Sequence, residues 1–116
     1  MPDRTQEAAP MSATDFHVLL VLAGEDLYGY AIMKAVEAQS RGAVSPEIGS
    51  LYRVLARLMK AGLVMELDLP DPDAEPQRGR PRRYYRITTA GRSALRAEAE
   101  RLRQVVSLAN GLLADR

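Results

Sequence analysis

Three glycines divide the first half of the chain into short segments, each with a helical pattern of apolar residues. Gly24, Gly42 and Gly62 are the expected stops, because glycine readily adopts the left-handed conformation that follows a helix end. The apolar spacing predicts one helix over residues 12–23 and a second over about 28–40. A chain of 116 residues, 47% of them apolar, can bury a single core, so we expect one domain.

The third segment has the clearest helix signals. Ser45 is suited to cap it, Pro46 to its first position and Glu47 to its positive end. For the first helix, Thr14 is the expected cap, with Asp15 in the first turn. The apolar stripe of the third helix contains Ile48, Leu51, Leu55 and Leu58. Its other face is a polar, basic stripe of Ser50, Arg53, Arg57 and Lys60.

Beyond Gly62 the pattern changes from helix to strand. Residues 83–88 have aromatic and β-branched content, and residues 63–69 alternate loosely, so the two segments predict a hairpin. The connection over 70–82 is rich in Pro, Asp, Gly and Arg and is too long for a tight turn. A last helix is expected from residue 89 to about 113.

Three helices, a β-hairpin and a long helix follow one another in the order of a winged helix-turn-helix. The predicted fold class is therefore mainly α with a small β-hairpin, plus a C-terminal dimerisation helix. We expect a disordered leader over 1–11 and a DNA-binding domain over 12–88, with its wing at about 63–88. The dimerisation helix takes up 89–116.

The charges are segregated along the chain although the net charge is only +1. Residues 48–65 contain no acid, and residues 76–97 contain seven arginines and no acid. Segregated positive charge is typical of a surface that binds phosphates, although an uneven solvated surface is the simpler alternative. Because both basic segments lie on elements suited to touch DNA, we favour double-stranded DNA as the partner.

Four motifs in order resemble the PadR family of bacterial transcriptional regulators. They are Leu27-Tyr28-Gly29-Tyr30-Ala31-Ile32, Gly49-Ser50-Leu51-Tyr52-Arg53-Val54-Leu55, Ala61-Gly62-Leu63-Val64 and Arg82-Arg83-Tyr84-Tyr85-Arg86-Ile87-Thr88-Thr89-Ala90-Gly91. The resemblance implies a winged-helix dimer of the subtype with a single C-terminal helix. It also implies a repressor that a small-molecule effector releases from DNA in some members. The chain has no tryptophan, whereas family members that bind flat aromatic drugs use one in the last helix.

The candidate DNA contacts lie on the third helix and the wing. Tyr52 borders the polar stripe, and two alternatives stay open for it: a phosphate contact through its hydroxyl, or packing against the second helix. Arg78-Gly79-Arg80-Pro81 is similar to a minor-groove-binding hook, but phosphate contact by the wing is the favoured alternative. The candidate set is Ser50, Tyr52, Arg53, Arg57, Lys60, Arg78, Arg80, Arg82 and Arg83.

The last helix carries a heptad-like apolar seam that is too long for one small domain to cover. We interpret the seam as a homodimer interface. An effector, if one binds, is expected between the protomers, beside the first and last helices. The seam contains Leu95, Ala99, Leu102, Val106, Ala109 and Leu113. The candidate effector residues are Phe16, Leu20, Val105 and Leu112.

Other classes of function have little support in the sequence. The chain has no cysteine and no cluster of metal ligands, and its single histidine, His17, lies on an apolar helix as a packed structural residue would. We therefore expect no enzyme activity, metal or cofactor. No segment is apolar enough for a membrane span or a signal peptide, and a cytoplasmic protein is expected. The alternative function is a winged-helix module that binds protein and no DNA.

Overall fold

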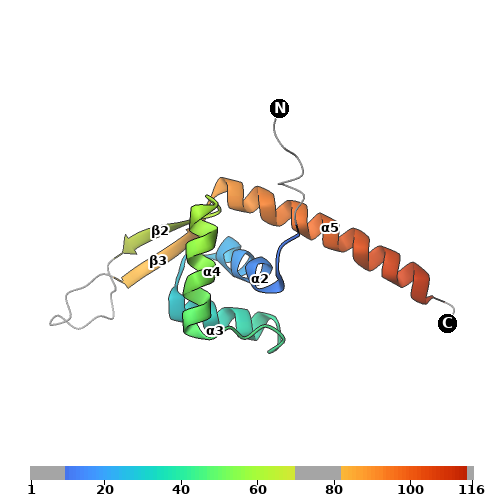
Figure 1. Ribbon diagram of the computed structural model, residues 1–116, viewed down its shortest axis with the longest axis horizontal. Helices are drawn as coiled ribbons and strands as arrows, with labels where there is room; N and C mark the ends of the chain where they lie inside the picture. Colours follow the sequence, from blue (N-terminus) through green and yellow to red (C-terminus); the bar gives the residue numbers. More distant parts are fainter. Residues whose placement is uncertain (1–9, 70–81, 115–116) are drawn as a thin grey trace.

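The computed structural model describes residues 10–69 and 82–114 and confirms the predicted order of elements (Figure 1). The wing strands β2 and β3 project from one side of the helical body, and α5 extends from it in the other direction. The elements are α2 (Ala13–Gly24), β1 (Leu27–Tyr28), α3 (Gly29–Gln39), α4 (Ile48–Lys60), β2 (Val64–Leu69), β3 (Arg82–Ile87) and α5 (Thr89–Leu113).

Two predicted helix caps are wrong. Ser12, not Thr14, caps α2, since its hydroxyl accepts a hydrogen bond from the backbone N–H of Asp15 at 3.0 Å. The first residue of α4 is Ile48, preceded by an N-cap residue, Glu47, whose side chain makes no capping hydrogen bond. Ser45 instead donates its hydroxyl to Glu37 of α3 at 3.3 Å. Both segments contain more than one polar residue near the helix start, and local sequence does not determine which of them meets the free N–H groups.

The sheet has three strands in the order β1-β3-β2, where the sequence predicted a hairpin only. The missed strand, β1, pairs Leu27 with Tyr85 and Tyr28 with Tyr84. Tyr28 was expected to begin a helix, but it pairs in the sheet and α3 begins at the next residue. A strand of two residues shows no period, and its partner strand lies far along the chain, so sequence pattern could not reveal it.

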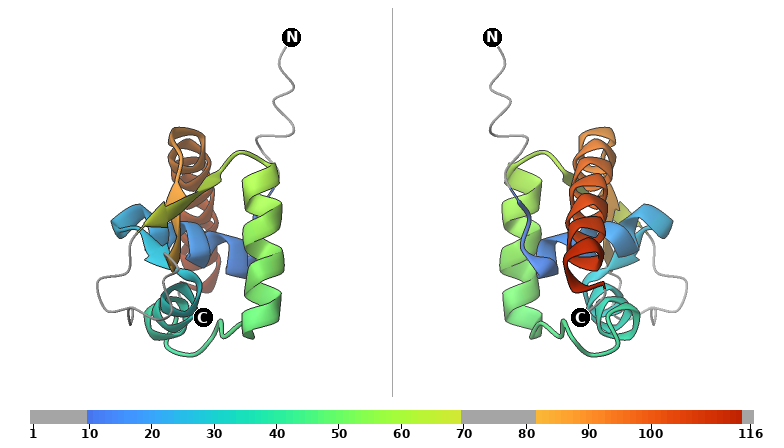
Figure 2. Two further views of the ribbon diagram at one scale, coloured as in Figure 1. Left: turned by 90° about the vertical axis from the view of Figure 1, so that its left-hand side faces the viewer. Right: turned by 90° about the vertical axis from the view of Figure 1, so that its right-hand side faces the viewer.

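The core lies where α2 meets the other helices and the inner face of the sheet. Both views of Figure 2 show α4 upright on the flank of the body, with α3 beside its lower end. Gly91 at the start of α5 lies against the carbonyl of Leu63, and a Cβ there would overlap that oxygen. The start of α5 is thus fixed against the residue that precedes β2. The core residues are Val18, Leu19, Leu22, Ile32, Val36, Leu51, Leu55, Leu58, Val64, Tyr85, Ile87 and Leu95.

The N-terminal leader predicted over 1–11 falls mostly outside the described residues. Its last member, Met11, is half-buried against the core, and its backbone N–H donates to Glu98 of α5 at 3.3 Å. The contacts of the folded domain therefore begin before Ser12. The predicted wing tip also falls largely outside the described residues, at 70–81.

Candidate nucleic-acid interface

The outward face of α4 is basic because its apolar stripe faces the core. Leu51, Leu55 and Leu58 are buried. At about 100° per residue, Arg53 and Lys60 fall on the side of the helix opposite these leucines, and both are exposed. Within the described residues neither side chain has a carboxylate partner. Arg53 donates to the hydroxyl of Ser50, one turn earlier, at 3.1 Å.

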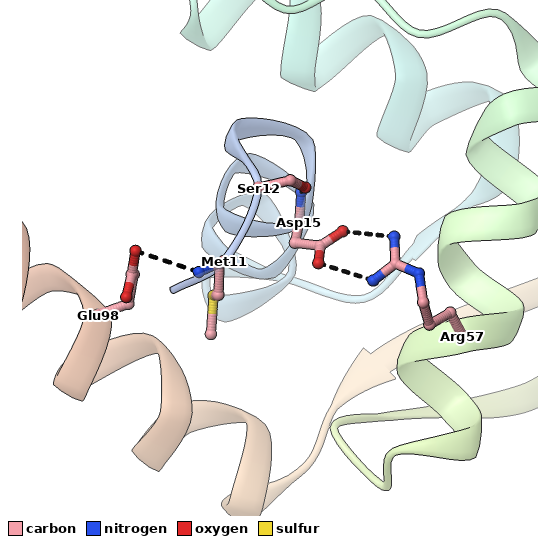
Figure 3. Close-up of polar contacts among 5 residues, drawn as sticks. All are labelled: Met11, Ser12, Asp15, Arg57 and Glu98. Carbon is pink, nitrogen blue, oxygen red and sulfur yellow. Dashed lines mark hydrogen bonds and ion pairs between the residues drawn. The ribbon is translucent and has the colours of Figure 1, made fainter. Parts of the chain in front are cut away.

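Arg57 differs from the rest of the predicted basic stripe. Its guanidinium donates two hydrogen bonds to the carboxylate of Asp15 on α2, at 2.7 and 2.8 Å (Figure 3). The hydrogen bond to Asp15 raises the pKa of Arg57. The Asp15 side chain is only 12% exposed, whereas that of Arg57 is 56% exposed. The predicted stripe is therefore divided: Arg53 and Lys60 point outward, and Arg57 turns its charged end toward α2.

Tyr52 packs against the first residue of α3. A Cβ placed on Gly29 would lie 2.5 Å from the Tyr52 hydroxyl oxygen and 2.9 Å from the ring. Of the two alternatives for this tyrosine, packing against the second predicted helix, α3, is thus present. The residue remains 48% exposed. The glycine at the start of α3 lets the two helices of the helix-turn-helix approach closely at this point.

The arginines at the base of the wing are paired with acids. Arg83 Nε lies 2.6 Å from Glu66 Oε2 and 3.9 Å from Asp68 Oδ1, both across the β2–β3 pair. Arg86 binds Asp26, in the connection between α2 and β1, at 2.7 Å, and this hydrogen bond lowers the pKa of Asp26. Arg82 begins β3. The predicted contacts Arg78 and Arg80 lie outside the described residues.

The apolar seam of α5 is divided between the core and solvent. Leu95 is 8% exposed and belongs to the core of its own chain. Leu102 and Ala109 are half-buried and Ala99 is exposed. Val106 and Leu113 are 56% and 71% exposed. The later half of α5 therefore presents apolar side chains to solvent, and the seam from Leu102 onward stays available to a partner.

The predicted effector residues lie on two helices. Phe16 of α2 packs against the core, and Leu20 on the same helix is partly exposed. Val105 and Leu112 are exposed on the later half of α5. His17 lies 3.0 Å from Gln39 of α3, measured from Nδ1 to the amide nitrogen, so it links two helices as a structural histidine does.

The family of the chain follows from its sequence as a whole. Residues 18–97 match the model of the transcriptional regulator PadR-like family. This chain belongs to the PadR-like family. The match extends from the middle of α2 to the first half of α5 and includes all of α4 and the described wing strands. The exposed arginine and lysine of α4 therefore lie in the part of the chain that matches this family of transcriptional regulators.

Solved structures share the fold of this PadR-like regulator. A PadR family regulator from Eggerthella lenta is 27% identical, with 90% of this chain and 87% of that one covered and a TM-score of 0.64. A transcriptional regulator from Clostridium thermocellum is 26% identical, with 86% and 89% covered and a TM-score of 0.69. The PadR-like regulator BC4206 from Bacillus cereus, at 24% identity, shows the same fold with a TM-score of 0.74. The comparison covers 88% of this chain and 92% of that one.

A curated relative of the PadR-like chain is an uncharacterised 37.1 kDa protein in transposon Tn4556 of Streptomyces fradiae. The two are 42% identical over 82 residues, which make up 71% of this chain and 21% of that protein. The chain thus spans about a fifth of that relative's length. In the part of the PadR-like chain that the structure describes, no helix is long and apolar enough to cross a bilayer.

The acids that pair with the arginines of this PadR-like protein were not predicted from the sequence. Asp15 was interpreted only as a first-turn acid, yet it precedes the buried Val18, Leu19 and Leu22 by three, four and seven residues. That spacing places its side chain on the buried stripe of α2 and could have revealed it. Glu98 of α5 lies three residues after the buried Leu95 and carries the same signal.

Proposed function

We propose that this PadR-like protein is a homodimeric repressor that binds an inverted-repeat operator with α4 in the major groove. The observation that carries the proposal is the outward face of α4, where exposed Arg53 and Lys60 have no carboxylate partner in the described part of the chain. A helix in the major groove needs hydrogen-bond donors on this face, and arginine can contact guanine through two of them. Exposed cations also bind phosphates.

The later half of α5 supports the dimer. Its apolar side chains are exposed although α5, with 25 residues, is about 37 Å long and covers its own domain only at its start. A second copy that packs against this half buries those side chains and relates two α4 helices by a two-fold axis. Half-sites about one helical turn apart, roughly 34 Å, then match the two helices.

The wing contacts the DNA backbone in this proposal. Arg82 and Arg83 lie at the start of β3, beside the segment that contains Arg78 and Arg80. Arg83 is paired with Glu66, so phosphate contact requires exchange of that exposed ion pair for a phosphate, at little cost. An effector that binds between the protomers, near Phe16, Leu20, Val105 and Leu112, would release the repressor by changing the separation of the two α4 helices.

The test is selection of bound duplexes from a random DNA pool, followed by footprinting and titration at several salt concentrations. We expect an inverted repeat. Arg53→Ala should lose about 1–3 kcal/mol on the selected duplex together with discrimination. Arg83→Ala should weaken binding to selected and scrambled duplexes equally and reduce the salt slope by about one. Absence of salt-dependent DNA binding would instead favour a protein-interaction module.

A further inference from the structure

The carboxylate of Asp15 is buried on a helix whose other buried residues are apolar. The residue is 8% exposed and shares the inner face of α2 with core residues. A buried carboxylate is costly unless it is paired and hydrogen-bonded. Its partner is Arg57, 42 residues further along the chain, which reaches it from α4 through two hydrogen bonds. The charge of Arg57 is therefore engaged inside the protein, on the side of α4 that faces α2 (Figure 3).

This ion pair adds a directional contact to the apolar packing of α4. Leucine contacts hold α4 against the core, and such contacts are not directional. A guanidinium that binds both oxygens of a carboxylate has a fixed, planar geometry. Because Arg57 is one turn from Arg53, its attachment to Asp15 determines which way the outward face of α4 points. A rotation of α4 about its own axis would move Arg53 away from any base edge it contacts.

The first turn of α2 is also attached to α5. Ser12 caps this turn, and the adjacent Met11 donates its backbone N–H to Oε2 of Glu98 at 3.3 Å. Glu98 is itself 6% exposed and accepts two hydrogen bonds from Arg101, at 2.6 and 3.0 Å. Asp15 therefore stands between the helix that carries the exposed apolar seam and the helix that carries the DNA-facing arginine (Figure 3).

We propose that Asp15 is a positioning residue for DNA recognition: it fixes the rotation of α4 through Arg57, and Glu98 anchors the same turn to α5. Arg57 then serves as the counter-ion of Asp15 and not as a DNA contact. The inference rests on the proposed function, since it concerns how α4 is presented to DNA. It assigns part of the sequence discrimination to a carboxylate that does not face DNA.

The first experiment compares Asp15→Asn with the double variant Asp15→Asn/Arg57→Met. The double variant removes both charges, which avoids leaving one buried charge unpaired. The probes are the duplex that the wild-type protein selects from a random pool and its scrambled version. Both variants are expected to lose about tenfold in discrimination, comparable to one bidentate base contact. Both should keep the wild-type salt slope, because no phosphate contact is lost.

Two controls set the scale of the effect. Arg53→Ala removes the proposed base contact itself and should lower affinity for the selected duplex together with discrimination. Glu100→Gln makes the same charge change as Asp15→Asn, but on an exposed acid of α5 that pairs with Arg103. It should leave discrimination and the salt slope at wild-type values.

Two results would overturn the inference while the wild-type protein still selects a sequence. In one, Asp15→Asn keeps wild-type discrimination. In the other, the double variant loses a further tenfold in discrimination, or a further unit of salt slope, relative to Asp15→Asn. That result would make Arg57 a DNA contact. Failure of the wild-type protein to select any sequence refutes the proposed function instead. Hydrogen exchange in the DNA-free protein then tests the positioning role by itself. Asp15→Asn should speed amide exchange in α4 and not in residues 89–95. Unchanged exchange in α4 would refute the positioning role.

Discussion

Truncation of one exposed leucine tests how α5 is used. Leu113 ends the seam of α5 and is 71% exposed in the single chain. Full burial of a leucine contributes about 1.5–3 kcal/mol, so its exposed part offers about 1–2 kcal/mol to a partner. Alanine keeps the Cβ, so we assign about 1 kcal/mol to the atoms removed by Leu113→Ala. A two-fold dimer loses this twice, about 2 kcal/mol, and its Kd should rise about 30-fold.

The matched variant is Leu95→Ala, at the other end of the same predicted seam. Leu95 is 8% exposed within its own chain, so its truncation should cost about 2–5 kcal/mol in free energy of unfolding. Sedimentation equilibrium gives the dimer Kd, and urea unfolding at several protein concentrations separates folding from association. A wild-type protein that is monomeric at micromolar concentration, or a Leu113→Ala variant with an unchanged dimer Kd, would refute this role of α5.

Three further perturbations test the packing described above. Gly29→Ala should lower the free energy of unfolding, measured by urea unfolding, by about 1–3 kcal/mol, because its Cβ would meet the Tyr52 ring. Adding Tyr52→Ala to this variant should reverse part of the loss. Gly91→Ala should cost at least as much in the same assay, since the Leu63 carbonyl that it meets is backbone and cannot turn away. The hydrogen bond from Arg101 lowers the pKa of Glu98, so this stabilisation is present above the ordinary glutamate pKa of about 4.3 and lost as the pH falls through the lowered value. Glu98→Gln should therefore flatten the fall of Tm below about pH 4.3, and a wild-type acid profile in that variant would contradict the assignment.

The order of the elements could be predicted from the sequence because it depends on neighbours along the chain. The leucines of α4 recur at helical spacing, and the glycine after it adopts the left-handed conformation, with φ of 80° at Gly62. These local signals predicted each helix to within a few residues. The cap of α2 and strand β1 were missed, because each depends on which group the chain brings close and not on spacing.

The acids that pair with Arg57 and Arg83 were set by the tertiary fold. Arg57 and Arg83 both lie in basic candidate segments by sequence, yet folding places Asp15 beside the first and Glu66 beside the second. Arg53 lies on the same helix as Arg57 and meets no carboxylate in the described residues. A charge interacts with what is near in space, and the distance along the chain does not limit it once the helices pack.

The same reason separates the two ends of α5. Leu95 and Leu113 belong to one repeating apolar pattern, so their spacing alone predicts that both lie on one side of a helix. Only the body of the domain, which α5 covers at its start and then leaves, decides that Leu95 is buried within the chain and that Leu113 is exposed. Burial depends on which surfaces meet, and a periodic pattern specifies a face of the helix without specifying what covers it.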